Sequence, residues 1–484
     1  MKFYHTLLIL LLSQYLLTAQ DCMCTLSEVE TNTVNSCDRI VGTVIEVSTV
    51  EELQNAVNEV NNLGGNRTIL IADGTYPISS TAWFPYITAS DVVIRSQSGN
   101  RDAVILTGQG MTSVAPDSEH GIYAAGDNIT IADLTIKEVG NHGIALHGDN
   151  LLVHNVRIQN AYEQMIKGNN VGDGADNGVV QCSLLEYPAG AGPQFYIGGL
   201  DIHGGNNWRV SDNIFRNIAS PSVSLAEHAV HFWNGSGDNI VERNQIINCD
   251  RGIGFGLGSS PNTGGIIRNN MIYNDGTGLF NDVGIGLESS PQTKVYNNTV
   301  FISYQNAIEY RFEETVGVDI RNNLCNRLIK SRNGGHATLG VNYEEAQADW
   351  FVNAAAGDLR LIEMQENVTD TGEDLTNEVL VDLDQNTRPQ GSGYDLGAQE
   401  LLTETTLTTD NVYCKNIVFP NPTTGVLTFA GTATRIAVTD VRGKEVFSAA
   451  NVSNADLSEL TSGLYFLRIE DERGREEVVR IVKE

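Results

Sequence analysis

The sequence predicts an all-β solenoid, because a short strand pattern recurs along the chain and a column of asparagines repeats in step with it. Between about residues 90 and 335, apolar–x–apolar segments such as G-I-A-L-H, G-L-D-I-H and A-V-H-F-W return at intervals of roughly 20 to 30 residues. Repeats of this length with a strand pattern form stacked coils, and each coil buries its inner face against the next.

One inward position is assigned to each predicted coil, and it fixes which neighbouring side chains face outward. The positions taken as equivalent are Ile122, Ile144, Gln164, Leu200, Val230, Ile253, Ile285, Ile308 and Leu328. Side chains alternate between the two faces of a strand, so the residues beside these positions point away from the core.

A second column lies at the turns, in units such as R-V-S-D-N, I-R-N-N and V-Y-N-N. It contains Asn213, Asn244, Asn270, Asn298 and Asn323. Single turn asparagines are common because they tolerate left-handed backbone angles. Five in register instead indicate a ladder of side-chain amides that hydrogen-bond along the solenoid axis.

The two ends of the solenoid are also marked. The segment S-T-V-E-E-L-Q-N-A-V-N-E-V, from Ser48, predicts an amphipathic helix with a Ser or Thr cap, which covers the first coil. Cys22, Cys24 and Cys37 can form one disulfide among themselves, whereas Cys182, Cys249 and Cys325 fall in apolar strand patterns and are expected to be buried.

Segments of the predicted solenoid and of the C-terminal region resemble known protein families. The segment I-L-I-A-D-G-T-Y-P-I resembles the first coil of secreted polysaccharide lyases and other right-handed parallel β-helix proteins. The segment D-L-D-Q-N-T-R-P-Q-G-S-G-Y-D-L-G-A-Q-E, over 382–400, resembles the closing motif of many β-helix surface proteins. F-P-N-P-T-T-G, followed by G-L-Y-F-L-R-I and V-R-I-V-K-E, resembles a type IX secretion sorting domain of Bacteroidetes. That resemblance implies a small β-sandwich, recognition by the type IX secretion machinery, and release from the cell or display on the outer-membrane surface.

The predicted organisation has five parts. They are a signal peptide over 1–19, a cysteine-containing segment over 20–47, the β-helix over 48–400, a polar linker over 401–414 and the sorting domain over 415–484. The formal net charge of −30 excludes the basic footprint of a nucleic-acid-binding protein. No apolar run after the signal peptide is long enough to span a membrane, and we expect an exported monomer.

The outward columns place titratable and aromatic side chains on one face of the solenoid. Asp201 and His231 are neighbours in one column, which continues to Glu309. A second column holds Lys167, His203, Trp233, Glu288 and Arg311. Gly254, Gly256 and Gly286 leave a floor without side chains beside them, with Arg251 at its edge. A long insertion from Tyr187 is expected to form a wall of this predicted cleft.

This set of residues favours a polysaccharide lyase that acts on a uronate-containing glycan by β-elimination. His231 is the favoured base, with Lys167 and His203 as the other candidates, and Arg311 and Arg251 neutralise the substrate carboxylate. Trp233 stacks on a sugar ring, and Asp201, Glu288 and Glu309 bind substrate or hold Ca²⁺.

Other functions are compatible with the same residues. A glycoside hydrolase would use two of Asp201, Glu288 and Glu309 as its carboxylate pair. An epimerase shares the proton-abstraction step with a lyase. A carbohydrate-binding or adhesive surface protein would keep Trp233 and the carboxylates without needing a base. The fold alone does not decide among them, since one scaffold hosts many activities.

Overall fold

The computed structural model describes residues 24–35, 39–78, 83–112, 120–169, 175–401, 418–419, 423–440, 444–470 and 476–483. The predicted signal peptide and nearly all of the predicted linker lie outside these residues. The chain divides after Thr403 into two compact units, which are described separately. The domain boundaries expected from the sequence stay predictions.

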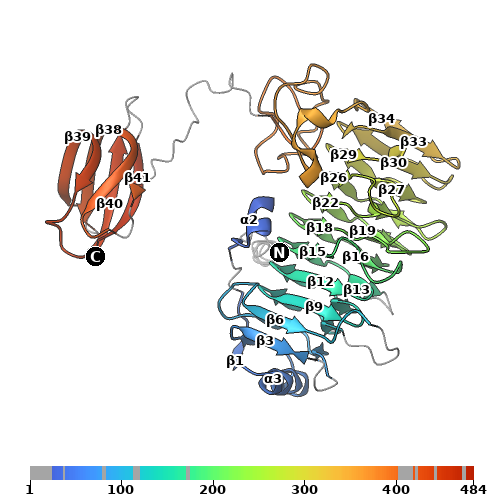
Figure 1. Ribbon diagram of the computed structural model, residues 1–484, viewed down its shortest axis with the longest axis horizontal. Helices are drawn as coiled ribbons and strands as arrows, with labels where there is room; N and C mark the ends of the chain where they lie inside the picture. The colour runs from blue at the N-terminus through green and yellow to red at the C-terminus, as the bar shows by residue number, and fades with distance from the viewer. Residues whose placement is uncertain are drawn as a thin grey trace, which may run out of the picture. The chain divides into compact units, whose positions relative to one another are not determined.

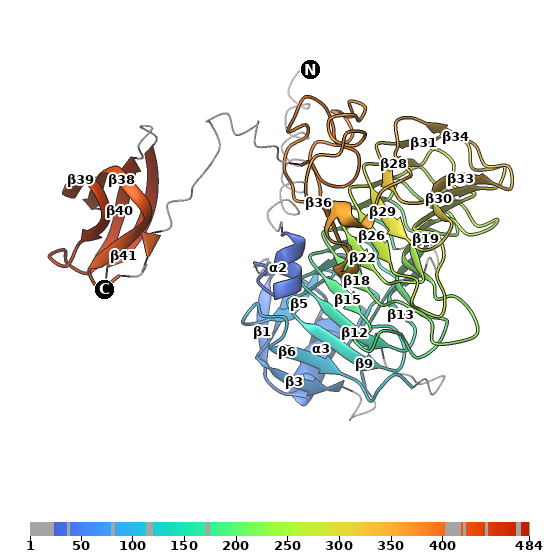
Figure 2. The ribbon, with the colours of Figure 1, turned by 45° about the horizontal axis from the view of Figure 1, so that its top comes forward.

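The first unit is a right-handed parallel β-helix, as predicted, and its coils stack into three long sheets (Figures 1 and 2). The first sheet contains β1 (Thr43–Val47), β2 (Arg67–Ile71), β5 (Val92–Ser96), β8 (Thr130–Ala132), β11 (Leu152–His154), β14 (Val179–Gln181), β17 (Arg209–Ser211), β21 (Ile240–Glu242), β25 (Ile266–Arg268), β28 (Lys294–Tyr296), β31 (Val318–Arg321) and β34 (Ala337–Leu339).

The second sheet contains β3 (Gly74–Pro77), β6 (Val104–Thr107), β9 (Thr135–Val139), β12 (Arg157–Ala161), β15 (Leu184–Glu186), β18 (Ile214–Arg216), β22 (Gln245–Ile247), β26 (Met271–Asn274), β29 (Thr299–Ile302) and β32 (Leu324–Cys325). The third contains β4 (Tyr86–Ile87), β7 (Ile122–Ala124), β10 (Ile144–Leu146), β13 (Gln164–Asn169), β16 (Gly198–His203), β19 (His228–Trp233), β23 (Arg251–Phe255), β27 (Ile285–Glu288), β30 (Asn306–Arg311) and β33 (Leu328–Arg332). A short ladder joins β20 (Ser236–Gly237) to β24 (Asn262–Thr263).

The interior of the β-helix is a continuous apolar stack, and most of the predicted inward positions occupy it. Along the third sheet, Ile122, Ile144, Leu200, Val230, Ile253, Ile285 and Ile308 are fully buried. Two assignments were wrong. Ile166, not Gln164, pairs with Ile144 and Leu200, and Ile329 replaces Leu328, which is 51% exposed. An irregularity between Asn306 and Ile308 shifts the register at the second of these positions.

The asparagine ladder is confirmed, and it extends one step further than predicted. The Nδ2 atom of each member donates to the Oδ1 atom of the next, from Asn213 through Asn244, Asn270, Asn298 and Asn323 to Asn342, over distances of 2.9–3.0 Å. Each Oδ1 atom also accepts a backbone N–H from the preceding member. The ladder therefore joins six coils at one turn.

The predicted capping helix is also confirmed. Helix α3 (Val50–Leu63) begins at Thr49, whose side chain accepts a hydrogen bond from the backbone N–H of Glu52. Its buried face contains Leu53, Ala56, Val57 and Val60, which belong to the same core as the first strands. The helix thus covers the apolar end of the stack (Figure 1).

The N-terminal segment is fastened to the middle of the β-helix by a disulfide that joins Cys24 to Cys182. This corrects the expectation that Cys24 pairs with Cys22 or Cys37. Cys182, Cys249 and Cys325 are buried as predicted, the last two as free cysteines. Helix α2 (Leu26–Thr31) follows Cys24 and buries Leu26 and Val29. Cys22 and Cys37 lie outside the described residues.

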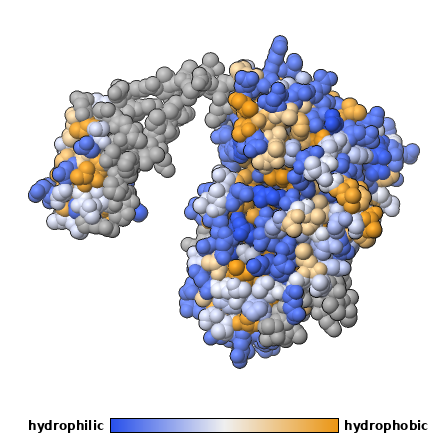
Figure 3. Space-filling model, viewed as in Figure 1, coloured by the Kyte–Doolittle hydropathy of each residue, from blue (hydrophilic) through white to orange (hydrophobic). Residues whose placement is uncertain are grey.

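The segment that follows the last coil folds back along the side of the stack. It contains η2 (Ala348–Trp350), β35 (Phe351–Asn353), η3 (Ala354–Ala356) and β36 (Asp358–Leu361). Arg388, buried in the predicted closing motif, pairs with Glu400 and donates to the side chain of Asn269. The face of the protein seen in Figure 3 is largely hydrophilic, as the composition requires.

The second unit is a small antiparallel β structure, consistent with the predicted sorting domain. It contains β37 (Val418–Phe419), β38 (Val426–Asp440), β39 (Glu445–Asp456), β40 (Gly463–Glu470) and β41 (Glu476–Lys483). The long strand β38 pairs with both β39 and β40. Leu427, Ile436, Val438, Leu467 and Ile481 are among the residues of a core of its own.

The ladder gives a first prediction. Replacing Asn270, in the middle, by Ala leaves buried partners on two coils without hydrogen bonds, and we expect a loss of about 2–4 kcal/mol in the free energy of unfolding. The matched variant Asn342→Ala should lower the free energy of unfolding by less, because Asn342 ends the ladder and has a ladder neighbour on one side only. Thermal or urea unfolding of both variants measures the difference, and equal losses would contradict a cooperative ladder.

Candidate functional site

The outer face of the third sheet carries the candidate site, and its register is fixed by strand pairing. One outward column runs through Tyr123, Ala145, Lys167, Asp201, His231, Gly254, Gly286, Glu309 and Lys330. The predicted pairs Asp201–His231, His203–Trp233 and Glu288–Arg311 are all strand partners. Lys167 was assigned to the wrong column, because it pairs with Asp201 and not with His203.

Asp201 is the centre of a polar cluster in which three neighbours interact with its carboxylate. The Lys167 ammonium is in direct contact with Oδ2, the Trp233 indole N–H donates to Oδ1 at 2.8 Å, and His203 Nε2 lies 3.6 Å from Oδ2. Burial acts to raise the pKa of Asp201. The interactions with His203 and with the Lys167 charge outweigh it, so the pKa lies well below its ordinary value. Asp201 is therefore a carboxylate at neutral pH.

Lys167 and His203 form a second contact at the edge of this cluster. Their Nζ and Nε2 atoms are 2.8 Å apart, and a lysine ammonium can only donate, so His203 Nε2 accepts. The side chain of His203 is 22% exposed, against 6% for Lys167. Among the three predicted bases, His203 is the one that solvent and ligands reach most easily.

His231 does not have the exposed position that the sequence suggested. It lies on the outer side of β19, but its side chain is fully buried. The Trp233 ring stacks on it at an interplanar angle of 8°, and the His228 ring also packs against it, with the two imidazole centroids 4.4 Å apart. His231 Nε2 lies 3.2 Å from the carbonyl oxygen of Gly256. A base covered in this way does not reach a substrate proton, and Trp233 has a packing role that the sequence did not indicate.

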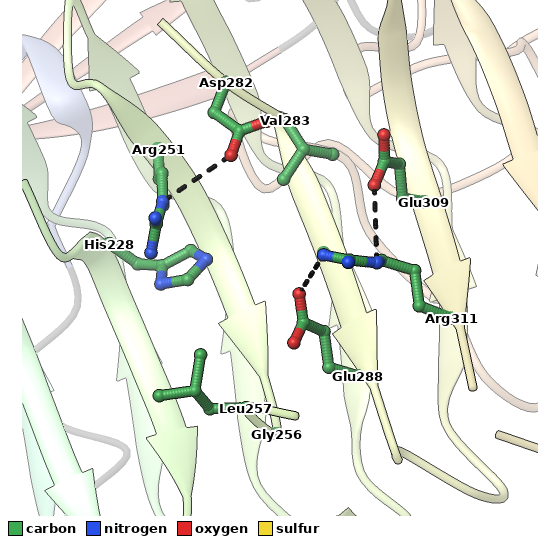
Figure 4. A pocket seen from close by; sticks show the side chains of 10 residues that line it. His228, Arg251, Gly256, Leu257, Asp282, Val283, Glu288, Glu309 and Arg311 are labelled. Carbon is green, nitrogen blue, oxygen red and sulfur yellow. Dashed lines mark hydrogen bonds and ion pairs between the residues drawn. The ribbon is translucent and has the colours of Figure 1, made fainter. Parts of the chain in front are cut away.

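A pocket of about 80 Å³ lies further along the same face, beside the glycine floor (Figure 4). Its lining includes His228, Arg251, Asp282, Glu288, Glu309 and Arg311. The floor is not open at Gly254, because the His228 ring lies over it. A Cβ atom added to Gly254 would be only 2.7 Å from His228 Nε2. Burial raises the pKa of Asp282, although the nearby Arg251 opposes it.

The cations of this pocket differ in how tightly they are paired. Arg311 contacts Glu288, and Glu309 accepts hydrogen bonds from Arg332 at 2.8 and 2.9 Å. The guanidinium of Arg251 makes no hydrogen bond to any described residue. Its nearest carboxylates are those of Asp282, at 3.6 Å, and Glu227, at 4.0 Å. Arg251 is thus the cation with the most donor capacity left for a ligand.

The predicted residues do not converge on one point but form two groups. Asp201 in β16 and Glu309 in β30 are separated by β19, β23 and β27, which is roughly 19 Å at the spacing of parallel strands. Asp201 therefore cannot share one Ca²⁺ ion with Glu288 or Glu309, nor can it form a hydrolase pair with either. Glu288 and Glu309 do lie on adjacent coils, as predicted.

Two residues of the site were missed by sequence reasoning. Glu227 was given no role from the sequence, yet its carboxylate lies 3.4 Å from His231 Nδ1. Tyr196, on the insertion from Tyr187, has its pKa raised by burial and by the charges of Asp201, Glu163 and Glu227, so its phenol lies within electrostatic range of these carboxylates. No motif marks Tyr196, because its position depends on the path of an irregular loop.

Fold and site define the first unit as a right-handed β-helix protein whose outer face carries a buried polar cluster and a charged pocket. The second unit belongs to a known family of sorting domains: residues 417–484 match the family described as "Secretion system C-terminal sorting domain". This domain indicates export through the type IX machinery, to the cell surface or the medium. Among the described residues, no helix is long and apolar enough to cross a membrane.

Solved structures resemble the chain only distantly. An alginate lyase from Paenibacillus sp. str. FPU-7 is 15% identical with a TM-score of 0.42, and the match covers 62% of this chain and 99% of that one. An endo-xylogalacturonan hydrolase from Aspergillus tubingensis is 13% identical with a TM-score of 0.36, and the match covers 62% of this chain and 94% of that one. PfbA, a surface adhesin of Streptococcus pneumoniae, is 13% identical with a TM-score of 0.34, and the match covers 66% of this chain and 91% of that one. No curated protein matches the chain. We draw no functional conclusion from these similarities.

The burial of His231 gives a second prediction, which concerns its contribution to stability. His231→Ala removes a fully buried ring from beneath Trp233 and should lower the free energy of unfolding by about 2–4 kcal/mol. His203→Ala, at the accessible edge of the same cluster, should cost clearly less. Unfolding curves of the two variants decide the matter, and a His231→Ala protein as stable as the parent would disprove the packing role.

Another pair of histidines makes stability depend on pH. His120 and His142 stack with ring centroids 5.4 Å apart, and burial lowers their pKa values to about 4 and about 3, with the neighbouring His120 adding to the effect at His142. In the unfolded chain both titrate near pH 6.5. Below pH 6.5 the unfolded state therefore binds more protons than the folded state, so the free energy of unfolding falls as the pH falls.

We expect this pair to cost about 1–2 kcal/mol per histidine at pH 5 relative to pH 7. A double variant, His120→Gln with His142→Gln, lacks these protonation sites and should lose less stability over the same interval. Unfolding measured at both pH values tests this difference. An acid sensitivity equal to that of the parent would show that other groups cause it.

Proposed function

We propose that this protein is an exported polysaccharide lyase that binds an acidic glycan along the outer face of the third sheet and cleaves it by β-elimination. The observation that carries the proposal is the contact between the Lys167 ammonium and the accessible imidazole of His203. It supplies a base and a cation within 2.8 Å of each other, which are the two groups that elimination next to a carboxylate requires.

In this mechanism His203 is the base and Lys167 the neutralising cation. The uronate carboxylate draws the Lys167 ammonium away from His203, which frees the lone pair of Nε2. Nε2 then takes the proton from the carbon that bears this carboxylate, and Lys167 stabilises the negative charge that develops on the carboxylate. Asp201 holds Lys167 in place through their ion pair. Tyr196, within electrostatic range of Asp201, is the candidate donor to the leaving oxygen.

The rest of the face serves as a binding track for a polymer. Tyr86 and Tyr123 pack edge to face on the early coils, with their centroids 4.9 Å apart, and Tyr86 is 46% exposed. Aromatic rings offer apolar faces to sugars. In the pocket on the later coils, Arg251 has donors left for a second carboxylate. A chain with a net charge of −30 would otherwise repel an acidic glycan, so these local cations favour binding here.

A glycoside hydrolase is the second candidate, and Asp282 is the observation that favours it. A general acid needs a raised pKa, and burial raises that of Asp282 in the pocket, close to Glu288 and Glu309. Asp201 does not suit this role, because its lowered pKa keeps it ionised. The reaction would then occur in the pocket and not at the Lys167–His203 contact.

A fourth prediction tests the proposal with the purified full-length chain and a panel of acidic and neutral polysaccharides. The parent protein should produce both new reducing ends and the ultraviolet absorbance of an unsaturated uronate on at least one acidic glycan. His203→Ala should lower this rate by roughly 100-fold or more, the usual contribution of a general base. His336→Ala, an exposed histidine outside the site, is the matched control and should keep full activity.

The other outcomes separate the alternatives. Reducing ends without absorbance, lost in Asp282→Asn but kept in His203→Ala, would mean a hydrolase. Retention on a glycan column without any cleavage would mean a binding or adhesive protein. A change of uronate configuration without chain cleavage would mean an epimerase. Each of these results contradicts the proposed elimination.

A further inference from the structure

Glu227, His228 and His231 bring three metal-ligating atoms together at the start of β19. One possible ligand atom from each of the three residues lies within 4.8 Å of the other two. His231 Nδ1 is 3.4 Å and His228 Nδ1 is 3.9 Å from Glu227 Oε2. In a tetrahedral zinc site with bonds of about 2.0–2.1 Å, neighbouring ligand atoms are roughly 3.3 Å apart. The group is therefore close to the size that such an ion requires.

The second observation is that these three atoms are buried without hydrogen bonds. Glu227 Oε2, His228 Nδ1 and His231 Nδ1 are inaccessible to solvent, and none of them has a hydrogen-bond partner. The side chains of His228 and His231 are 8% and 0% exposed. A buried polar atom without a hydrogen-bond partner destabilises the folded state. In a native structure it therefore indicates that a proton, a water molecule or an ion occupies the site.

The tautomer of His231 is the one that a metal ligand needs. Its Nε2 atom lies 3.2 Å from the carbonyl oxygen of Gly256, which can only accept, so Nε2 carries the proton. In the neutral ring, Nδ1 then presents a bare lone pair toward the Glu227 carboxylate. Metal-bound histidines donate their other ring N–H to a backbone carbonyl or carboxylate in this way.

A proton is a poorer explanation of this group than a metal ion. An extra proton on His231 Nδ1 would be attracted to Glu227 and to Asp201, whose Oδ1 is 3.7 Å away. It would still leave His228 Nδ1 without a partner, 3.9 Å from the same carboxylate. One divalent cation placed among the three atoms satisfies all of them at once.

We propose that Glu227, His228 and His231 bind a divalent transition-metal ion of the zinc type. Two imidazoles and one carboxylate suit Zn²⁺ and its neighbours in the first transition row, whereas Ca²⁺ prefers oxygen ligands. Three protein ligands leave at least one coordination position for water or a ligand oxygen. His228 also lines the pocket that contains Arg251, so the ion lies beside the anion-binding part of the face.

The site is tested by metal binding to the full-length chain, without reference to any activity. The protein is stripped with a chelator, and ZnCl₂ is then added in a calorimetric titration with excess Ca²⁺ and Mg²⁺ present. One Zn²⁺ ion per chain should bind tightly, elemental analysis of the dialysed protein should give the same ratio, and the melting temperature should rise with Zn²⁺.

Variants show whether the bound ion occupies this site. His228→Gln should weaken the tight Zn²⁺ binding by roughly 100-fold or more, the scale on which changes in and around metal sites act. Because His228 is buried and this variant can misfold, Glu227→Gln, at a side chain that is 24% exposed, serves as a second variant and should also weaken binding. His203→Ala and His336→Ala are the controls and should keep the parent affinity.

Two results would overturn the site. The first is the absence of tight binding to the parent chain for Zn²⁺, Mn²⁺, Co²⁺ and Ni²⁺ alike. The second is parent-like Zn²⁺ affinity in folded His228→Gln and Glu227→Gln proteins, which would place the ion elsewhere. Neither result depends on glycan cleavage, so the metal site and the proposed lyase activity are tested independently of each other.

Discussion

The register between successive coils is the constraint on which the rest of this structure depends. Parallel strands stack about 4.8 Å apart, and any slip of one residue would exchange the inward and outward faces of a coil. Two features hold this register: the buried aliphatic column through Val230 and Ile253, and the amide ladder through Asn270. Because both run along the axis, they also fix the spacing of every outward side chain, including those of the candidate site.

The parts of the fold that repeat were predictable from the sequence, and the parts that break the repeat were not. The ladder and most of the core column follow a strict pattern, so their positions could be deduced by alignment within the chain. Gln164 and Leu328 were misassigned where a strand begins early or a bulge shifts the pairing. The disulfide of Cys182 joins segments that are 158 residues apart, and no local pattern indicates it.

The strand positions of the candidate site residues could be predicted from the sequence, but the burial of their side chains could not. Alternation along β19 correctly put His231 and Trp233 on the outer side, and pairing correctly put His231 beside Asp201. Periodicity carries no information on what covers a side chain, and His231 is covered by its own neighbours on the same strand. The accessible imidazole is that of His203, because it lies at the end of β16 and at the edge of the cluster.

The central claim is that an acidic glycan binds along the outer face of the third sheet, over β13, β16 and β19. A crystal structure of an inactive His203→Ala variant with an acidic oligosaccharide tests it most directly. We predict one uronate carboxylate within hydrogen-bond distance of Lys167 and the chain of sugars running along the solenoid axis. An oligosaccharide bound to the first or second sheet, with the Lys167 region unoccupied, would contradict the claim.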